Sequence, residues 1–123
     1  MKILLIGVGG FVGAILRYLL SKFFTVVLGN VIPFGTLFVN VTGSFILGFI
    51  HTLSVEKLVL GDNVRFFVGI GLLGAFTTFS TFSVETIHLF EDGAFILGLL
   101  NMFLNLFLSL FAAFFGIYVS RLF

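Results

Sequence analysis

Long apolar segments alternate with short polar ones along the whole chain. Each apolar segment can cross a hydrocarbon core, which takes roughly 20 helical residues. None shows the two-residue alternation of a membrane β-strand. The pattern therefore predicts an all-α integral membrane protein, one domain of residues 1–123, whose four transmembrane helices cover about residues 2–28, 33–53, 64–90 and 94–122.

The short polar segments between the apolar ones indicate on which side of the membrane the chain ends lie and how the protein inserts. An even number of spans puts the N-terminus, the central linker and the C-terminus on one side of the membrane. That side holds Lys2, Lys57, Arg65 and Arg121, whereas Lys22 and Arg17 lie toward the other. Orientation follows an excess of Lys and Arg in short loops, and here the excess is small. Insertion in both orientations, and hence an antiparallel homodimer, is our hypothesis.

Composition excludes a soluble domain. Of 123 residues, 60% are hydrophobic and 9% are charged, and the mean hydropathy is +1.33. A small soluble domain could not bury so much apolar surface. A net charge of +1 without a basic run gives no reason to expect a nucleic-acid partner. We expect the first segment to be retained, because Arg17 and Lys22 interrupt what would otherwise resemble a signal peptide.

The third apolar segment contains a polar interruption. Gly69, Gly71 and Gly74 lower helix propensity, and five hydroxyl residues follow within positions 77–83. Hydroxyl side chains can satisfy backbone groups that an unwound turn sets free. We therefore expect a break near Gly74 to Thr78, and broken helices in membranes are a means of binding ions. The glycines match a dinucleotide-binding pattern, but no strand precedes them and no βαβ unit surrounds them.

Phe79, Phe82 and Glu85 recur every three residues and share a helix face. Phenyl rings have a positive edge, which can face a small anion. The alternative is ordinary packing, in a chain with 20 phenylalanines.

Amide side chains in the second and fourth segments are costly to bury in lipid. Asn40 could donate to an anion or could join two helices. Asn101, Asn105 and Ser109 follow at intervals of four and form a polar stripe. The stripe must face either a helix seam or a water-filled pathway, and we favour the pathway.

The remaining ionisable residues do not indicate an enzyme. Arg17 lies deep in the first segment, where it can snorkel or pair. His51 and His88 lie near segment ends, at the membrane interface. No nucleophile stands with a base, and no spacing suggests a transition-metal site.

Three motifs together resemble those of the Fluc (CrcB) fluoride channels. They are T-L-F-V-N-V-T-G-S-F at 36–45, G-A-F-T-T-F-S-T-F at 74–82, and Gly13-x-x-x-Arg17-Tyr18. The resemblance covers essentially the whole chain. It implies a fluoride-selective channel of the bacterial inner membrane, an antiparallel dual-topology homodimer with two pores that passively exports fluoride through the lipid bilayer.

The resemblance also implies site residues. Asn40 would be the pore asparagine, and Phe79 and Phe82 would touch fluoride with their ring edges. A structural Na⁺ at the dimer axis would take the backbone carbonyls of Gly74 and Thr77. The other pathway residues implied are Ser80, Thr81, Glu85, Asn101, Asn105 and Ser109, with Arg17 structural.

Two other functions fit four spans. A small proton-coupled multidrug exporter needs a carboxylate deep in its first span, where this chain has Arg17 and no acid. A non-transporting membrane subunit would use the polar stripe only as a helix seam.

Overall fold

The computed structural model describes residues 1–123 and is entirely helical. Four apolar spans are each long enough to cross a membrane: Lys2–Leu28, Phe34–Glu56, Asp62–Glu91 and Phe95–Arg121. The all-α prediction with four long apolar helices is confirmed. The spans begin and end within a few residues of the predicted bounds.

Three of the spans change helix type along their length. The first is the single helix α1 (Lys2–Leu28). The others include π-helical segments, which in other proteins often occur at functional sites. In chain order the remaining elements are α2 (Phe34–His51), η1 (Thr52–Glu56), α3 (Asp62–Val64), η2 (Arg65–Leu73), α4 (Gly74–Phe76), α5 (Phe79–Glu91), α6 (Phe95–Phe103), η3 (Leu104–Leu108) and α7 (Ser109–Arg121).

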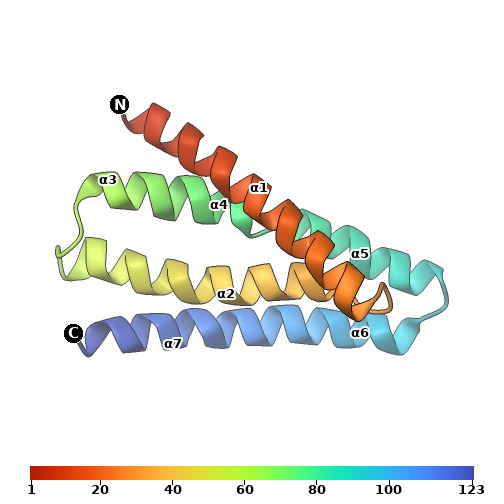
Figure 1. Cartoon of the computed structure of the whole chain (residues 1–123). Helices are drawn as coiled ribbons and strands as arrows, with labels where there is room; N and C mark the ends of the chain where they lie inside the picture. Colours follow the sequence, from red (N-terminus) through yellow and green to blue (C-terminus); the bar gives the residue numbers. More distant parts are fainter.

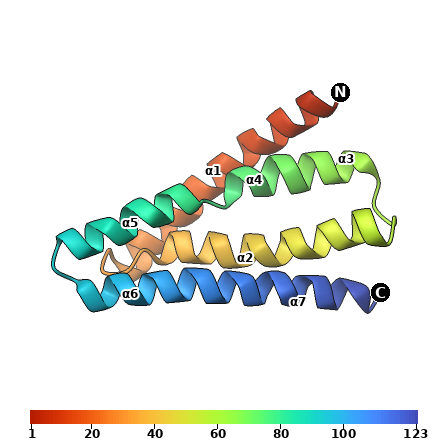
Figure 2. The ribbon, with the colours of Figure 1, turned by 180° about the vertical axis from the view of Figure 1, so that it is seen from behind.

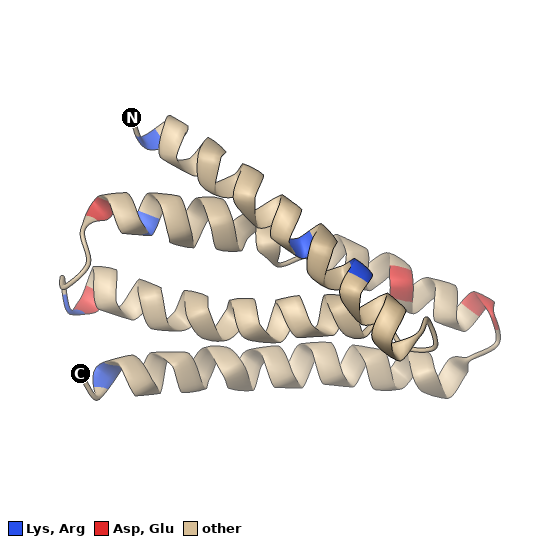
Figure 3. Ribbon diagram, in the orientation of Figure 1, with Lys and Arg blue, Asp and Glu red and all other residues tan.

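The second and fourth spans lie antiparallel and side by side, and the third lies along the second (Figures 1 and 2). Helix α1 crosses the third span diagonally, over the point where α4 gives way to α5. Both termini and the linker after η1 share one end of the bundle. Charged residues gather toward the two ends and leave the middle of every span except the first largely free of charge (Figure 3).

Glycines allow the backbones of α1 and η2 to touch. A Cβ atom at Gly9 would collide with the carbonyl oxygen of Phe67, and one at Gly13 with that of Leu72. From the other side, a Cβ at Gly71 would lie 2.6 Å from the carbonyl oxygen of Ile6. Close backbone approach at small residues is how helices associate in lipid, which supplies no hydrophobic drive. The Gly9-x-x-x-Gly13 pair therefore fixes how α1 crosses the third span.

Few side chains are buried inside one protomer. Only 21 of 123 residues are buried, and just four of these are counted as hydrophobic core. Large apolar side chains point outward along every span, as expected where the surroundings are lipid or another subunit. Buried polar residues outnumber the buried core residues, so specificity inside the bundle comes largely from hydrogen bonds.

Candidate functional site

The third span breaks at two threonines between α4 and α5. Thr77 and Thr78 are both extended, with φ/ψ of −85°/155° and −154°/118°. The predicted break near Gly74 to Thr78 is confirmed. In a continuous helix the N–H of Thr78 would bond the carbonyl of Gly74, but here it donates to Asn40 Oδ1 over 2.8 Å.

Asn40 on α2 binds the extended backbone of Thr78 with both ends of its amide. Its Oδ1 accepts from the Thr78 N–H, and its Nδ2 donates to the Thr78 carbonyl oxygen over 3.1 Å. A single side chain thus satisfies both polar groups of the residue at the break. Because unpaired backbone groups in lipid cost several kcal/mol each, Asn40 is what makes the break tolerable.

The Thr78 side chain starts the second half-helix. Its Oγ1 accepts from the Thr81 N–H over 3.2 Å, as an N-cap residue does. The same hydroxyl donates to Thr81 Oγ1 over 3.1 Å and lies 3.4 Å from Ser80 Oγ. Three of the five hydroxyl residues noted in the sequence, Thr78, Ser80 and Thr81, therefore form one connected group at the N-terminus of α5, whereas Thr77 and Ser83 donate to backbone carbonyls four residues earlier.

Amide side chains continue from Asn40 to the fourth span. Asn40 Nδ2 donates to Asn105 Oδ1 over 3.0 Å. Asn105 Nδ2 in turn donates to Asn101, both to its backbone oxygen and to Oδ1, each over 3.0 Å. Asn101 Nδ2 donates to Thr86 Oγ1 over 2.9 Å, and Thr86 donates to the Phe82 carbonyl over 2.8 Å. We call Asn40, Asn105, Asn101 and Thr86 the amide chain.

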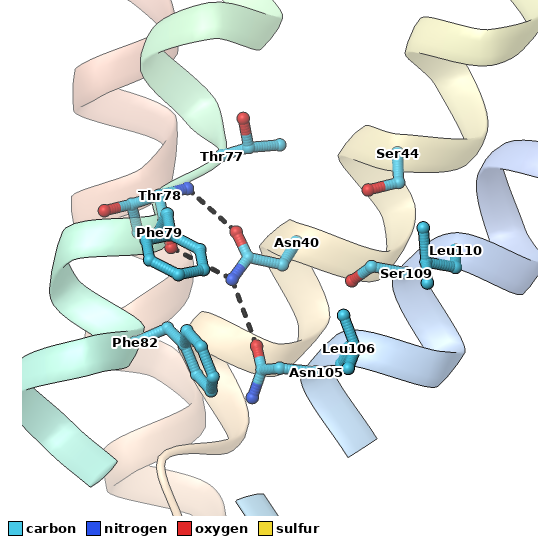
Figure 4. A pocket seen from close by; sticks show the side chains of 10 residues that line it. All are labelled: Asn40, Ser44, Thr77, Thr78, Phe79, Phe82, Asn105, Leu106, Ser109 and Leu110. Atoms are coloured by element: carbon cyan, nitrogen blue, oxygen red, sulfur yellow. Dashed lines mark hydrogen bonds between the residues drawn. The ribbon is translucent and has the colours of Figure 1, made fainter. Parts of the chain in front are cut away.

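A cavity of about 270 Å³ opens beside the break. Its walls come from the second span, the break and α5, and the fourth span (Figure 4). The lining combines amides, hydroxyls and apolar side chains: Asn40, Ser44, Thr77, Thr78, Phe79, Phe82, Asn105, Leu106, Ser109 and Leu110. The structure therefore brings together five predicted pathway residues, namely Asn40, Phe79, Phe82, Asn105 and Ser109.

The two phenyl rings stand at the mouth of this cavity. The ring centroids of Phe79 and Phe82 lie 5.5 Å apart with the planes at 65°, so an edge of one ring faces the other. Phe79 is 77% exposed in the protomer, and Phe82 is half-buried. Ser109 Oγ on the opposite wall is buried and has no hydrogen-bond partner. An anion in the cavity could accept from this hydroxyl.

Four predicted pathway residues lie outside the cavity lining. Ser80 and Thr81 are exposed on the protomer surface. Asn101 is fully buried between helices, at 0% exposure. Within one protomer it occupies a helix seam, whereas Asn105 and Ser109 of the same stripe face the cavity. Glu85 is half-buried, and its Oε1 is buried without a hydrogen-bond partner.

Three further predicted residues, Arg17, Gly74 and Thr77, contribute differently. Arg17 is half-buried on α1 and makes no ion pair or side-chain hydrogen bond within the protomer. Gly74 is exposed, and a Cβ there would meet nothing within 4 Å. The carbonyl of Thr77 receives no hydrogen bond, and that of Gly74 has lost its helical donor to Asn40. Free carbonyls of this kind are suitable ligands for a hard cation.

The structure gives specific contacts to three residues for which the sequence predicted none: Thr78 was predicted only as the end of the break, and Ser44 and Thr86 were not predicted to be in the site. Thr78 caps α5 and pairs with Asn40, Ser44 lines the cavity, and Thr86 ends the amide chain. The N-cap role of Thr78 could have been recognised, because a threonine before a helix start is a common cap. Ser44 and Thr86 have no such sequence signal.

A bundle of four membrane-spanning helices, one of them broken beside a polar cavity, defines a small membrane transport protein or channel. Residues 4–117 match the family model described as CrcB-like protein, Camphor Resistance (CrcB). The chain belongs to this CrcB family.

Three relatives share the same name. The chain is 44% identical over 122 residues to the fluoride-specific ion channel FluC of Magnetococcus marinus, covering 99% of each chain. It is 46% identical over 121 residues to the protein of the same name from a Sulfurihydrogenibium species, covering 98% of each. A third such channel, from Shewanella frigidimarina, is 47% identical over 103 residues, covering 84% of this chain and 82% of the relative.

Proposed function

We propose that this chain is a fluoride-selective ion channel that lets fluoride leave the cell passively. The observation that carries the proposal is the cavity at the broken helix, where Asn40 and Ser109 face Phe79 and Phe82. Relatives of nearly equal length named as fluoride-specific channels support the choice of ion. The polar cavity alone supports only a small polar solute or ion.

Fluoride is small and strongly hydrated, so a wholly apolar passage would exclude it. Hydroxyl and amide groups of Asn40, Asn105 and Ser109 can replace water molecules one at a time. The positive edges of Phe79 and Phe82 would hold the ion weakly on the other wall. Weak, successive sites allow an ion both to enter and to leave, as conduction requires.

An antiparallel dual-topology homodimer in the bacterial inner membrane is part of the proposal. Ser80 and Thr81 are exposed in one protomer beside the exposed Phe79, although polar side chains facing lipid are costly. A second copy would cover this surface, close each cavity and give two pores. In that setting Ser80, Thr81 and Glu85 would contribute to the pathway, as would Asn101 through Asn105, and Arg17 would have a structural role.

A structural Na⁺ fits the break. The carbonyls of exposed Gly74 and half-buried Thr77 lack helical hydrogen bonds, so two protomers could present four oxygens to one cation. Oxygen donors without thiol or imidazole are typical of a hard cation. The ion would add positive potential near the pathway and hold the half-helices in place.

Flux from liposomes tests the channel function. Purified protein should release fluoride rapidly under a K⁺-driven voltage and retain chloride. Phe79→Ile and Phe82→Ile should lower fluoride release at least tenfold, whereas Phe114→Ile, on an exposed phenylalanine outside the cavity, should not. Folded, dimeric protein that releases no fluoride would exclude the proposed function.

Labelling tests the dual topology. The chain has no cysteine, so a single cysteine placed at Leu122 can be modified alone. A membrane-impermeant reagent should reach about half of these sites from outside intact cells. Complete or absent labelling would show one orientation and contradict an antiparallel dimer.

A further inference from the structure

Two neighbouring residues of α2 contact the break in the third span. Asn40 hydrogen-bonds the backbone of Thr78 (Figure 4), and the buried Gly43 faces the preceding residue, Thr77. Residues three apart share one face of a helix. Both extended residues of the break therefore lie against the same face of α2, Thr78 through hydrogen bonds and Thr77 through packing.

The side chain of Thr77 occupies the space that Gly43 leaves open. A Cβ atom at Gly43 would collide with the methyl carbon Cγ2 of Thr77 and would lie 3.3 Å from Cδ1 of Phe76. Rotation about χ1 of Thr77 would move its methyl and hydroxyl groups together, because both are bonded to Cβ. Position 43 therefore accepts no side chain while Thr77 keeps its rotamer.

The rotamer of Thr77 is fixed by hydrogen bonds to the preceding turn. Its Oγ1 donates to the carbonyl oxygen of Leu73 over 3.0 Å, and its N–H donates to the same oxygen over 3.1 Å. Turning the methyl group away from α2 would break the hydroxyl bond. A larger residue at position 43 must therefore either break this bond or displace the backbone at the break.

The backbone at this point sets the direction of the Thr77 carbonyl. In a trans peptide the C=O of one residue and the N–H of the next point in opposite directions, and the chain has no cis peptide bond. The N–H of Thr78 donates to Oδ1 of Asn40 on α2. The carbonyl of Thr77, in the same peptide unit, therefore points away from α2.

We propose that Gly43 is a positioning residue for the cation at the break, an inference that rests on the proposed Na⁺ site. Gly43 offers no ligand itself. Because it admits the Thr77 methyl group, the peptide unit between Thr77 and Thr78 can lie against α2 and direct its carbonyl outward. A side chain at position 43 would push this peptide unit off α2 and misdirect one of the two carbonyls that each protomer offers to the ion.

The deciding measurement is the Na⁺ dependence of thermal stability of the purified dimer, with choline chloride replacing sodium chloride at constant ionic strength. An ion that binds the folded protein alone raises its thermal midpoint with concentration. Gly43→Ala should need about tenfold more Na⁺ than wild type for the same rise above its midpoint in choline, a change within the range that overpacking produces.

Removal of the colliding methyl group should restore the response to Na⁺. Thr77→Ser loses Cγ2 and keeps Oγ1 for Leu73, so the double variant Gly43→Ala/Thr77→Ser should need about as much Na⁺ as wild type. The matched control is Gly69→Ala, at another buried glycine, where a Cβ would meet only Cδ1 of Leu47, at 3.8 Å. Its Na⁺ requirement should equal that of wild type.

A role in packing alone predicts that Gly43→Ala lowers the thermal midpoint equally at every Na⁺ concentration. That result, or a double variant that responds no better than Gly43→Ala, would overturn the proposal. If Gly43→Ala does not assemble, the double variant must assemble and respond like wild type, and its failure also overturns the proposal. Wild-type protein that conducts fluoride without responding to Na⁺ would refute the Na⁺ site and this inference with it, whereas wild-type protein without fluoride flux would refute the channel function itself.

Discussion

The two halves of the broken third span are held in the bundle by different means. The first half, through η2, packs against α1 by backbone contact at Gly9, Gly13 and Gly71. The second half, α5, is tied to its neighbours by Asn40 and by the hydrogen bond between Asn101 and Thr86. Close van der Waals packing therefore stabilises the first half, and side-chain hydrogen bonds stabilise the second.

The difference shows how a membrane bundle can combine a fixed part with a functional part. Backbone contact at glycines brings the two helices so close that a side chain does not fit between them. The hydrogen-bonded amides of Asn40 and Asn105, by contrast, line a cavity and offer polar groups to it. The ion pathway is therefore expected on the side of α5, where the polar cavity lies.

The largest expected effect comes from filling the glycine contact. Gly13→Val places side-chain atoms where the backbone of Leu72 lies, and neither backbone can yield cheaply. Overpacking of this kind costs about 1–3 kcal/mol or more, so we expect little folded protein in detergent by size-exclusion chromatography. Gly7→Val on the same helix meets no atom within 4 Å and is the control. Equal losses at both positions would mean that helix packing is not set by Gly13.

The next effect comes from removing the amide at the break. Asn40→Leu leaves the N–H and carbonyl of Thr78 without partners, at about 1–3 kcal/mol for each group that stays buried. Fluoride flux should be lost, and the thermal midpoint of the folded protein should fall. Ser44→Ala, one turn further along the cavity wall, removes a hydroxyl that makes no hydrogen bond within the protomer and should lower flux much less. If the two variants have equal stability, Asn40 is not what supports the break.

The existence of the break was predictable because glycines and hydroxyls interrupt an apolar span. Its exact geometry was not, since Thr77 and Thr78 are the same residue type and only tertiary contacts decide which one meets Asn40. The stripe of Asn101, Asn105 and Ser109 was also visible. The four-residue spacing could not show that these side chains face different surroundings. The hydrogen-bond partner of Asn101 is Thr86, which lies 15 residues earlier, across a turn.

The phenylalanines illustrate the same limit. Spacing places Phe79 and Phe82 on one face, but other pairs along the chain also stack or meet at their edges. Only the cavity beside the break distinguishes this pair from pairs facing lipid. The π-helical segments likewise have no sequence signature, because apolar residues fit α- and π-turns alike.

A smaller effect should follow from weakening the cap of the second half. Thr78→Val removes the acceptor for the Thr81 N–H but leaves the backbone of Thr78 paired with Asn40. Loss of an N-cap costs about 0.5–2 kcal/mol, so the thermal midpoint should fall by less than in Asn40→Leu. Thr78→Ser keeps the cap and should match wild type. A Thr78→Val protein as unstable as Asn40→Leu would show that the cap stabilises α5 as much as the amide does, and would contradict the order predicted here.

The smallest effect is expected where neither type of contact operates, at the water-facing end of the bundle. Glu56 and Arg121 form a bidentate ion pair, with distances of 2.8 and 3.0 Å, between the second and fourth spans. Both side chains are about half exposed, at 45% and 57%, and exposed pairs contribute about 0–1 kcal/mol. Glu56→Gln should therefore shift the thermal midpoint slightly at low salt and not at all at high salt, because mobile ions screen the pair.

Glu91→Gln, an exposed acid outside any ion pair, is the control. A double-mutant cycle with Arg121→Gln measures the coupling free energy between the two side chains directly. If this coupling were as large as the loss of stability in Asn40→Leu, charges at the membrane surface would stabilise the bundle as much as contacts within the bilayer do.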